Sequence, residues 1–367
     1  MPPPSHARAL EIDGIRGWAS FFVLLYHQFH EMLTALVPWT NSAWLAPIFQ
    51  GRLAVCVFFV LSGDALSTNF FARGGVSPVF IDRLLVRRYL RLTIPILMSC
   101  TLVFVLRWAD ADLHRPAAVI LDRPNWLGDA IDFNFSIVGL LRYSLLGVYT
   151  AHSKAVSYNP YLWTMSIELI GSMLVFLTCY LWPRLRSGKW TVAGIGLFLF
   201  GLDSFYCLFF AGMFLGQLRL ESFFAKFDAS TRHQALWWAA FIGLTLILVA
   251  TYNVDKKPIL FDMAMAIALV FVLYAQRGIR GFLRGRFSTW LGDISFPVYL
   301  VQFALIISLE SWLVTLWSAR QAPVEWLPLI GLTAVVATLI VASLFRWAEK
   351  TVLFHADGMV LRVLRKD

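Results

Sequence analysis

Residues Ile12 to Glu31 read IDGIRGWASFFVLLYHQFHE, and this stretch decides the fold class. It starts with a glycine-containing polar segment, continues as an apolar run able to enter a bilayer, and ends in a polar cluster that includes His27. If the helix enters the membrane near Gly17, His27 lies about halfway through a hydrocarbon layer of roughly 30 Å. Charged groups at that depth cost a few kcal/mol or more, so the cluster is a candidate functional site. Interhelical hydrogen bonding by His27 and His30 is the alternative.

Arg16 precedes His27 by eleven residues, which is about three turns of an α-helix and roughly 16 Å of rise. At about 100° per residue, the two side chains lie within roughly 20° of the same helix face. We therefore expect Arg16 and His27 to line one site, with His30 rotated away from it.

The composition is that of a polytopic membrane protein. Of the 367 residues, 59% are hydrophobic and only 14% are charged, against roughly 25% charged residues in soluble domains. The net charge of +9 does not require a nucleic-acid partner, because Lys and Arg collect in the cytoplasmic loops of membrane proteins. The length predicts one helical domain over residues 1–367. The N-terminus lacks the features of a cleavable signal, so the first helix is expected to remain as an anchor.

The four cysteines are expected to be buried small hydrophobes. All four lie within apolar runs and none has metal-ligand spacing: Cys56, Cys100, Cys179 and Cys207. We therefore predict neither a disulfide nor a metal site from them.

Apolar runs predict an all-α transmembrane bundle of about ten helices. The runs fall near 17–37, 51–70, 92–108, 161–182, 190–202, 204–218, 236–252, 259–275, 294–317 and 327–346. With the N-terminus inside, the inner segments hold 21 basic residues and the outer segments eight, so both termini are predicted to be cytoplasmic. The outer segment 109–160 carries the sequon Asn134-Phe135-Ser136, a candidate glycosylation site. An endomembrane location is expected if the protein is eukaryotic.

The second helix, GRLAVCVFFVLSGDALS (Gly51 to Ser67), has a polar break at Ser62, Gly63 and Asp64. Gly63 is expected to allow close approach of another helix. Asp64 is a candidate functional residue, although at the cytoplasmic end of the helix it could be solvated.

A basic stripe follows in RLLVRRYLRLTIP (Arg83 to Pro95). Its residues Arg87, Arg88 and Arg91 can grip phosphate groups through planar, multi-donor side chains. Anchoring to the inner leaflet by basic residues is the alternative.

The stretch YNPYLWTMSIELIGSM (Tyr158 to Met173) opens a further helix and carries Ser166 and Glu168. Glu168 would face lipid only at high cost, so it is expected to point into the bundle and pair with His27 or His30. A carboxylate that orients an imidazole produces a general base able to take a proton from an alcohol.

Together these stretches resemble the acyltransferase 3 family of integral membrane acyltransferases. The matching blocks, in the family's order and spread over nearly the whole chain, are IDGIRGWASFFVLLYH, GRLAVCVFFVLSG, RRYLRLTIP, YLWTMSIEL, GDISFPVYLVQ and RWAEKTVLF. The form WTMSIELIGS is similar to that of fungal members. Two positions depart from the family's pattern: Asp64, where an apolar or aromatic residue is more usual, and Gln302, where many relatives have histidine.

The resemblance implies about ten helices, an acyl-CoA donor on the cytosolic side and an acceptor hydroxyl on a sugar or small alcohol. It also implies that Arg16, His27 and Glu168 line the reaction site, with Arg88 and Arg91 near the coenzyme phosphates.

The predicted function is therefore O-acyl transfer, with acetyl-CoA as cosubstrate and no tightly bound cofactor. His27 is expected to be the general base or a transient acyl acceptor, oriented by Glu168, with Arg16 placing or polarising the thioester. The acceptor is a small molecule or carbohydrate, such as a secondary metabolite. The further candidate site residues are Asp13, Ser62, Asp64, Ser166 and, for the coenzyme, Arg87. A secondary transporter with a His/Glu proton relay is the rival from another class, and a catalytically inert relative is a third option.

Overall fold

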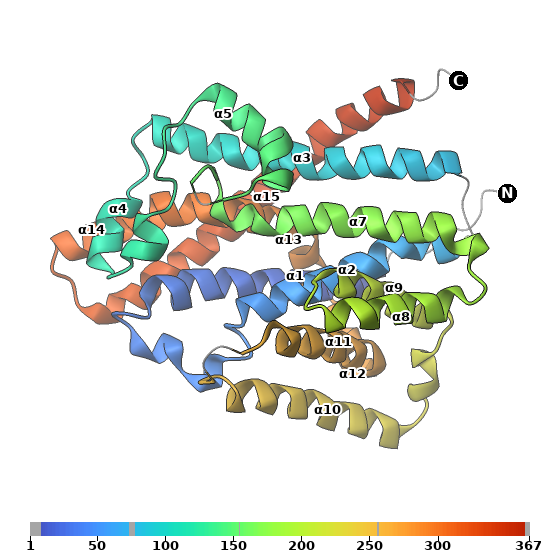
Figure 1. Ribbon diagram of the computed structural model, residues 1–367. Helices are drawn as coiled ribbons and strands as arrows, with labels where there is room; N and C mark the ends of the chain where they lie inside the picture. The colour runs from blue at the N-terminus through green and yellow to red at the C-terminus, as the bar shows by residue number, and fades with distance from the viewer. Residues whose placement is uncertain (1–8, 73–77, 154, 255–256, 364–367) are drawn as a thin grey trace. The chain divides into compact units, whose positions relative to one another are not determined.

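The structure is a computed structural model that describes residues 9–72, 78–153, 155–254 and 257–363, and, within these, side chains other than those of 78–83 and 356–363. The described part of the chain contains helices and connecting turns, with no strand (Figure 1). The prediction of an all-α fold is confirmed.

The described residues form ten long helices, and two of these helices continue into one turn of π-helix. The π-turn η1 (Tyr26–Glu31) follows α1, and η9 (Ile306–Glu310) follows α13. The long helices are α1 (Leu10–Leu25), α2 (Gly51–Ala72), α3 (Pro78–Trp108), α7 (Thr164–Leu181), α8 (Gly188–Gly201), α9 (Tyr206–Leu220), α10 (Thr231–Ala250), α11 (Ile259–Ala275), α13 (Arg286–Leu305) and α15 (Leu327–Val363).

Shorter elements build the connections. They are η2 (Pro38–Asn41), η3 (Ala43–Leu45), α4 (His114–Ile120), η4 (Pro124–Gly128), α5 (Ile137–Arg142), η5 (Tyr143–Gly147), α6 (Val148–Thr150), η6 (Pro160–Trp163), η7 (Trp182–Arg184), η8 (Phe224–Phe227), α12 (Arg277–Leu283), α14 (Ser311–Ala319) and η10 (Val324–Trp326).

Six helical segments among the described residues are long and apolar enough to cross a membrane, or seven if the bent pair α11 and α12 forms one span. All ten predicted ranges fall in largely helical structure, but α8 and α9 have only 14 and 15 residues, against about 20 for a full span. The count of ten spans is therefore not confirmed, and the orientation of the termini stays a prediction.

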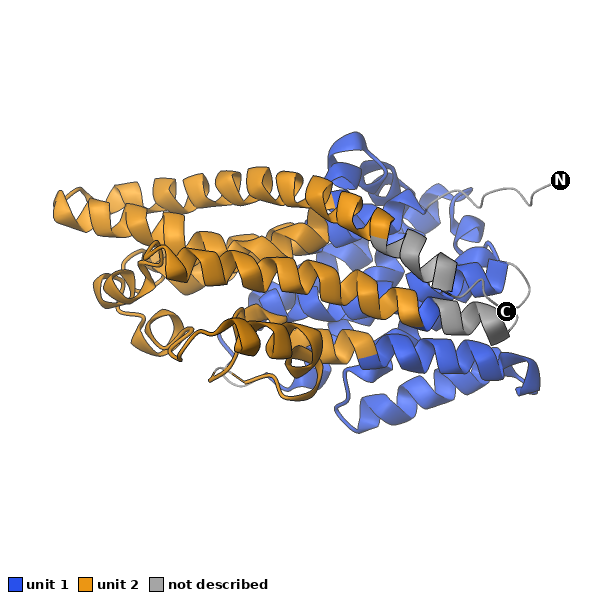
Figure 2. Ribbon diagram, turned by 90° about the horizontal axis from the view of Figure 1, so that it is seen from above, with its two compact units in different colours: residues 1–19, 50–85, 170–293 blue, residues 20–49, 86–169, 294–367 orange. Residues whose placement is uncertain are grey.

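The chain divides into two compact units, and it passes back and forth between them, so that each unit contains three separate stretches of sequence (Figure 2). Unit 1 consists of residues 1–19, 50–85 and 170–293, and unit 2 of residues 20–49, 86–169 and 294–367. Four of the five boundaries fall within helices, in α1, α3, α7 and α13, and the fifth lies just before α2. Whether the chain is a single domain stays a prediction.

Unit 1 is organised by close contact between α2 and α9. A Cβ added at Gly63 would collide with the backbone of Phe209, and one added at Gly212 would collide with the backbone of Val60. The prediction that Gly63 allows close helix approach is confirmed.

A buried ion pair stabilises the same helix pair. Asp64 is fully buried and accepts hydrogen bonds from Arg219 Nη2 at 2.8 Å, Arg219 Nε at 3.1 Å and the Tyr274 hydroxyl at 2.7 Å. The Thr68 hydroxyl also donates to it at 2.9 Å. The expectation that Asp64 could be solvated is wrong, because these partners replace water around its carboxylate.

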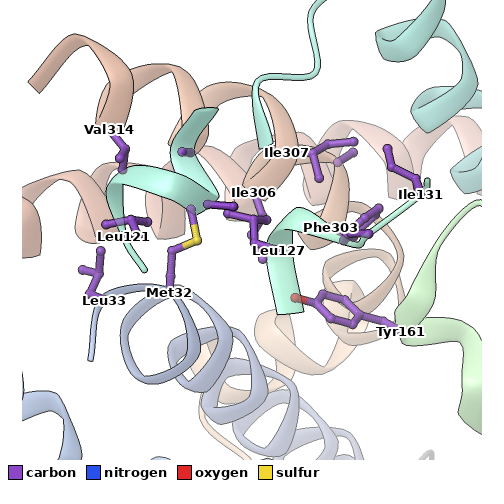
Figure 3. Packing of buried hydrophobic residues seen from close by; sticks show 14 of the residues in the cluster. Met32, Leu33, Leu121, Leu127, Ile131, Tyr161, Phe303, Ile306, Ile307 and Val314 are labelled. Carbon is purple, nitrogen blue, oxygen red and sulfur yellow. The ribbon is translucent and has the colours of Figure 1, made fainter. Parts of the chain in front are cut away.

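Unit 2 has an apolar core that surrounds the end of the first helix. Figure 3 shows Met32 and Leu33, which directly follow η1, beside Leu121 of the segment 109–160. Ile306 and Ile307 of η9 belong to the same cluster. The core thus joins the polar stretch singled out in the sequence to two further parts of the chain. The four cysteines are buried, as predicted, and their thiols are free.

Candidate active site

The candidate site is built on the π-turn η1, which carries both His27 and Glu31. His27 Nδ1 lies 2.8 Å from Glu31 Oε2, and the Tyr26 hydroxyl donates to Glu31 Oε1 at 3.0 Å. Both carboxylate oxygens therefore have partners within the same turn. A carboxylate on one imidazole nitrogen fixes the tautomer and the ring plane.

The other nitrogen of this imidazole is open. Among the described residues, His27 Nε2 has no hydrogen-bond partner, and the His27 and Glu31 side chains remain 14% and 23% exposed. A fixed Nδ1 and an open Nε2 are what a general base needs to receive a proton from a bound hydroxyl group.

Aromatic rings position the imidazole. The Tyr161 ring stacks on His27 with centroids 4.0 Å apart and an angle of 17° between planes. The Trp126 ring is also nearly parallel to the imidazole, at 6.5 Å and 12°. The Tyr161 hydroxyl is buried and makes no hydrogen bond within the described chain, so the tyrosine contacts the histidine through its ring. Figure 3 shows Tyr161 beside Phe303 in the core of unit 2.

The expected pairing of Glu168 with His27 is not observed. The Glu168 carboxylate forms an ion pair with Arg88, while His27 pairs with Glu31. His30 Nδ1 contacts the backbone oxygen of Thr40 at 3.2 Å, and its ring stacks on Tyr26. The reason is local: Glu31 reaches His27 from within the same π-turn, so no carboxylate from α7 is required.

Glu168 nevertheless lies in the same unit as the histidine. Tyr299 of α13 donates from its hydroxyl to the backbone oxygen of Tyr161, and that hydroxyl lies 2.9 Å from Thr164 Oγ1. Glu168 is therefore positioned to hold Arg88, a role different from the one predicted.

The basic stripe lies on α3. Arg91 is exposed, whereas Arg88 is half-buried and engaged with Glu168. Arg87 is also half-buried. Of the three predicted coenzyme contacts, Arg91 is the most accessible.

The remaining predicted residues are distributed over both units. Arg16 and Asp13 lie in the part of α1 that belongs to unit 1, so their approach to His27 stays a prediction. Asp64 and Ser62 also belong to unit 1, where Asp64 has the structural contacts described above. Ser166 donates to the backbone oxygen of Trp163 at 3.3 Å. Asn134 is exposed.

The helices and the site together define a class. Several segments able to cross a membrane and a carboxylate-held imidazole with an open nitrogen describe a multi-pass membrane protein with a candidate base. The model of an acyltransferase domain, that of the acyltransferase 3 family, matches residues 10–346, and the chain belongs to this family.

One similar protein is the O-acetyltransferase PaAT-1 of Phomopsis amygdali, which is 25% identical over 244 residues. The alignment covers 57% of this chain and 48% of the relative, so the match spans about half the length of that protein. No solved structure matches the chain.

Sequence reasoning missed three parts of the site. Glu31 could have been recognised, because its spacing of four residues from His27 brings two helical side chains together. Trp126 lies about a hundred residues after His27 in the chain, and Tyr161 lies further still. No periodic pattern points to either residue.

Membership in an acyltransferase family disfavours the transporter alternative.

Proposed function

We propose that this protein is a membrane-bound O-acyltransferase that moves an acetyl group from acetyl-CoA to the hydroxyl of a small molecule or carbohydrate. The observation that carries the proposal is the pair formed by His27 Nδ1 and Glu31, which leaves Nε2 open. Family membership supports acyl transfer. The fungal relative, named as an O-acetyltransferase, supports acetyl as the group transferred.

In the proposed reaction, His27 Nε2 accepts the proton of the acceptor hydroxyl as its oxygen attacks the thioester carbonyl. The carbon–oxygen bond forms, the tetrahedral intermediate collapses, and the carbon–sulfur bond breaks. The imidazolium then returns the proton to the departing thiolate, so that free coenzyme A and an ester are the products. Glu31 stabilises the imidazolium between the two proton transfers, as a carboxylate does in related catalytic arrangements.

The arginines have separate proposed roles. Arg91, with Arg87 and Arg88 beside it on α3, would bind the coenzyme phosphates, because a guanidinium offers paired donors to phosphate oxygens. Glu168 would hold Arg88 in place. Arg16 would polarise the thioester carbonyl.

The proposal is tested with purified protein in detergent or nanodiscs, by following thiol release from acetyl-CoA with a panel of methyl glycosides and terpenoid alcohols as acceptors. His27→Ala is expected to lower turnover by about 10² to 10⁴, the usual contribution of general acid–base catalysis. His30→Ala is the matched control and should retain most activity, because the His30 imidazole lies against the backbone oxygen of Thr40. Wild-type turnover in His27→Ala together with an inactive His30→Ala would overturn the assignment.

A further inference from the structure

Two π-turns of unit 2 face each other through buried polar side chains that the proposed reaction does not use. Gln28 lies in η1 and Glu310 ends η9, and both are fully buried. With its amide oriented by the hydrogen bonds available, Gln28 donates to Glu310 Oε1 at 3.2 Å and also to Oε2. This contact joins residues 282 positions apart in the chain.

Burying the polar side chains of Gln28 and Glu310 costs free energy. In the described part of the chain, no Lys, Arg or His forms an ion pair with Glu310. Burial of a carboxyl group is costly unless its polar atoms are paired, and apolar residues of similar volume are often at least as stabilising. A contribution to folding stability therefore does not explain why a glutamate, and not an apolar residue, occupies position 310.

The pair is also placed where it can affect the candidate base. Gln28 is the residue after His27 in the same π-turn. The next residue, Phe29, packs on α15, where a Cβ added at Gly331 would lie 3.1 Å from its ring. Single π-turns occur often at functional sites, and their position depends on the surrounding contacts. Gln28 and Phe29 therefore fix η1 from η9 and from α15.

We propose that Glu310 is a positioning residue of the acyltransferase site, which acts through Gln28 to hold the π-turn that aims His27 Nε2 at the acceptor. This inference rests on the proposed function. It assigns no proton transfer to Glu310, because its role is to accept the hydrogen bonds of the Gln28 amide.

The most direct test is the double variant Gln28→Leu/Glu310→Leu. Replacing both partners by apolar groups leaves no buried polar group unpaired, so the protein should unfold at or above the wild-type temperature. Its kcat is expected to fall about 10- to 100-fold, the size of loss seen at metal sites when a residue that orients a ligating histidine is removed, while KM for acetyl-CoA stays unchanged. Glu310→Gln, which can still accept a hydrogen bond from Gln28, should recover most of kcat.

Ser311→Ala is the matched control. It removes a buried side-chain hydrogen bond next to Glu310, from Ser311 Oγ to the backbone oxygen of Ile306, without touching Gln28, and its kcat should be near that of the wild type. A folded double variant with wild-type kcat would overturn the inference. So would Glu310→Gln with a kcat as low as that of the double variant, because a hydrogen-bonding role predicts rescue.

The two proposals can fail separately. Absence of acyl transfer by the wild type would refute the proposed function, and wild-type turnover in His27→Ala would refute the role of His27 as the base, whatever the behaviour of Glu310. An inactive His27→Ala combined with a normal double variant would refute only the role of Glu310.

Discussion

At the scale of single residues, the proposed chemistry depends on how the two nitrogens of His27 are used. Nδ1 is occupied by Glu31, and Nε2 is left for substrate. Glu168, which a sequence argument placed beside the histidine, instead holds Arg88. The acidic residues of the site therefore have different roles: Glu31 orients the proposed base, and Glu168 orients a proposed coenzyme contact.

The exposed Arg91 gives a clean test of coenzyme binding. Arg91→Lys is expected to raise KM for acetyl-CoA several-fold with a smaller change in kcat, because an ammonium cannot reproduce the paired donors of a guanidinium. Steady-state kinetics with varied acetyl-CoA measure both constants. Arg88→Lys is the comparison, and it should also lower stability because it disturbs the ion pair with Glu168. An unchanged KM in the double variant Arg88→Ala/Arg91→Ala would reduce the stripe to a membrane anchor.

His114 in α4 predicts a pH dependence of stability. Burial lowers the pKa of His114 below its ordinary value of about 6.5, and the charges of Arg107 and Arg115 act in the same direction, although Asp112 opposes them. The folded state therefore binds fewer protons than the unfolded state in the interval between the two pKa values. Stability is fully present above the unfolded pKa and is lost as the pH falls towards the folded pKa.

Thermal unfolding at pH 7.5 and pH 5.5 checks this prediction. The wild-type protein should lose more of its melting temperature on acidification than His114→Gln, which cannot titrate. His233→Gln, a change at an exposed histidine, serves as the control and should behave like the wild type. Equal losses in the wild type and His114→Gln would show that this histidine does not contribute.

At the scale of elements, the candidate base lies at the end of a helix, where the helical geometry changes. Two of the long helices finish in π-turns, and the candidate base lies in one of them. A regular α-helical register assumed from Arg16 to His27 therefore changes just before His27. Hydrophobic runs in the sequence locate the helices, but they carry no signal for a change from α to π geometry, which depends on tertiary contacts.

The contact between α2 and α9 is predicted to depend on Asp64. Asp64→Leu should cost about 3–5 kcal/mol, because it leaves the buried guanidinium of Arg219 without its partner. Asp64→Leu/Arg219→Leu should recover much of that loss and retain acyl transfer, since both side chains act in packing. The test is to measure the unfolding midpoint and the turnover of the wild type, of Asp64→Leu and of the double variant. A stable double variant without activity would return Asp64 to the catalytic candidates.

At the scale of the whole molecule, the sequence was sufficient for the helical class, the buried cysteines and the family. The sequence did not allow the partners of the buried charged side chains to be predicted. Asp64 meets Arg219 across 155 positions and Arg88 meets Glu168 across 80, and such pairings follow from helix packing that composition and periodicity do not encode. The number of spans was also left unconfirmed, because short apolar helices such as α8 resemble spans in a hydropathy pattern.

The predicted topology is tested at Asn134, which is exposed. If residues 109–160 face the lumen of a glycosylating compartment, the protein should carry a glycan that Asn134→Gln removes, seen as a mobility shift on gels before and after deglycosylation. The hydroxyl of Ser136 completes the sequon, so Ser136→Ala should give the same result. Protection of this segment from modification on the cytosolic side is also expected, and protease cleavage of it from the cytosol would contradict the orientation.

The central claim is that His27 and Glu31 act as one catalytic unit, and a double-mutant cycle measures it most directly. Turnover is compared for the wild type, Glu31→Gln, His27→Ala and the combined variant, each shown to fold and to bind acetyl-CoA. Residues that act as a unit are strongly non-additive. Glu31→Gln should lower kcat about 10- to 100-fold in the wild-type background and have almost no effect once His27 is alanine. An equal loss in both backgrounds would mean that Glu31 acts independently of His27 and would contradict the account.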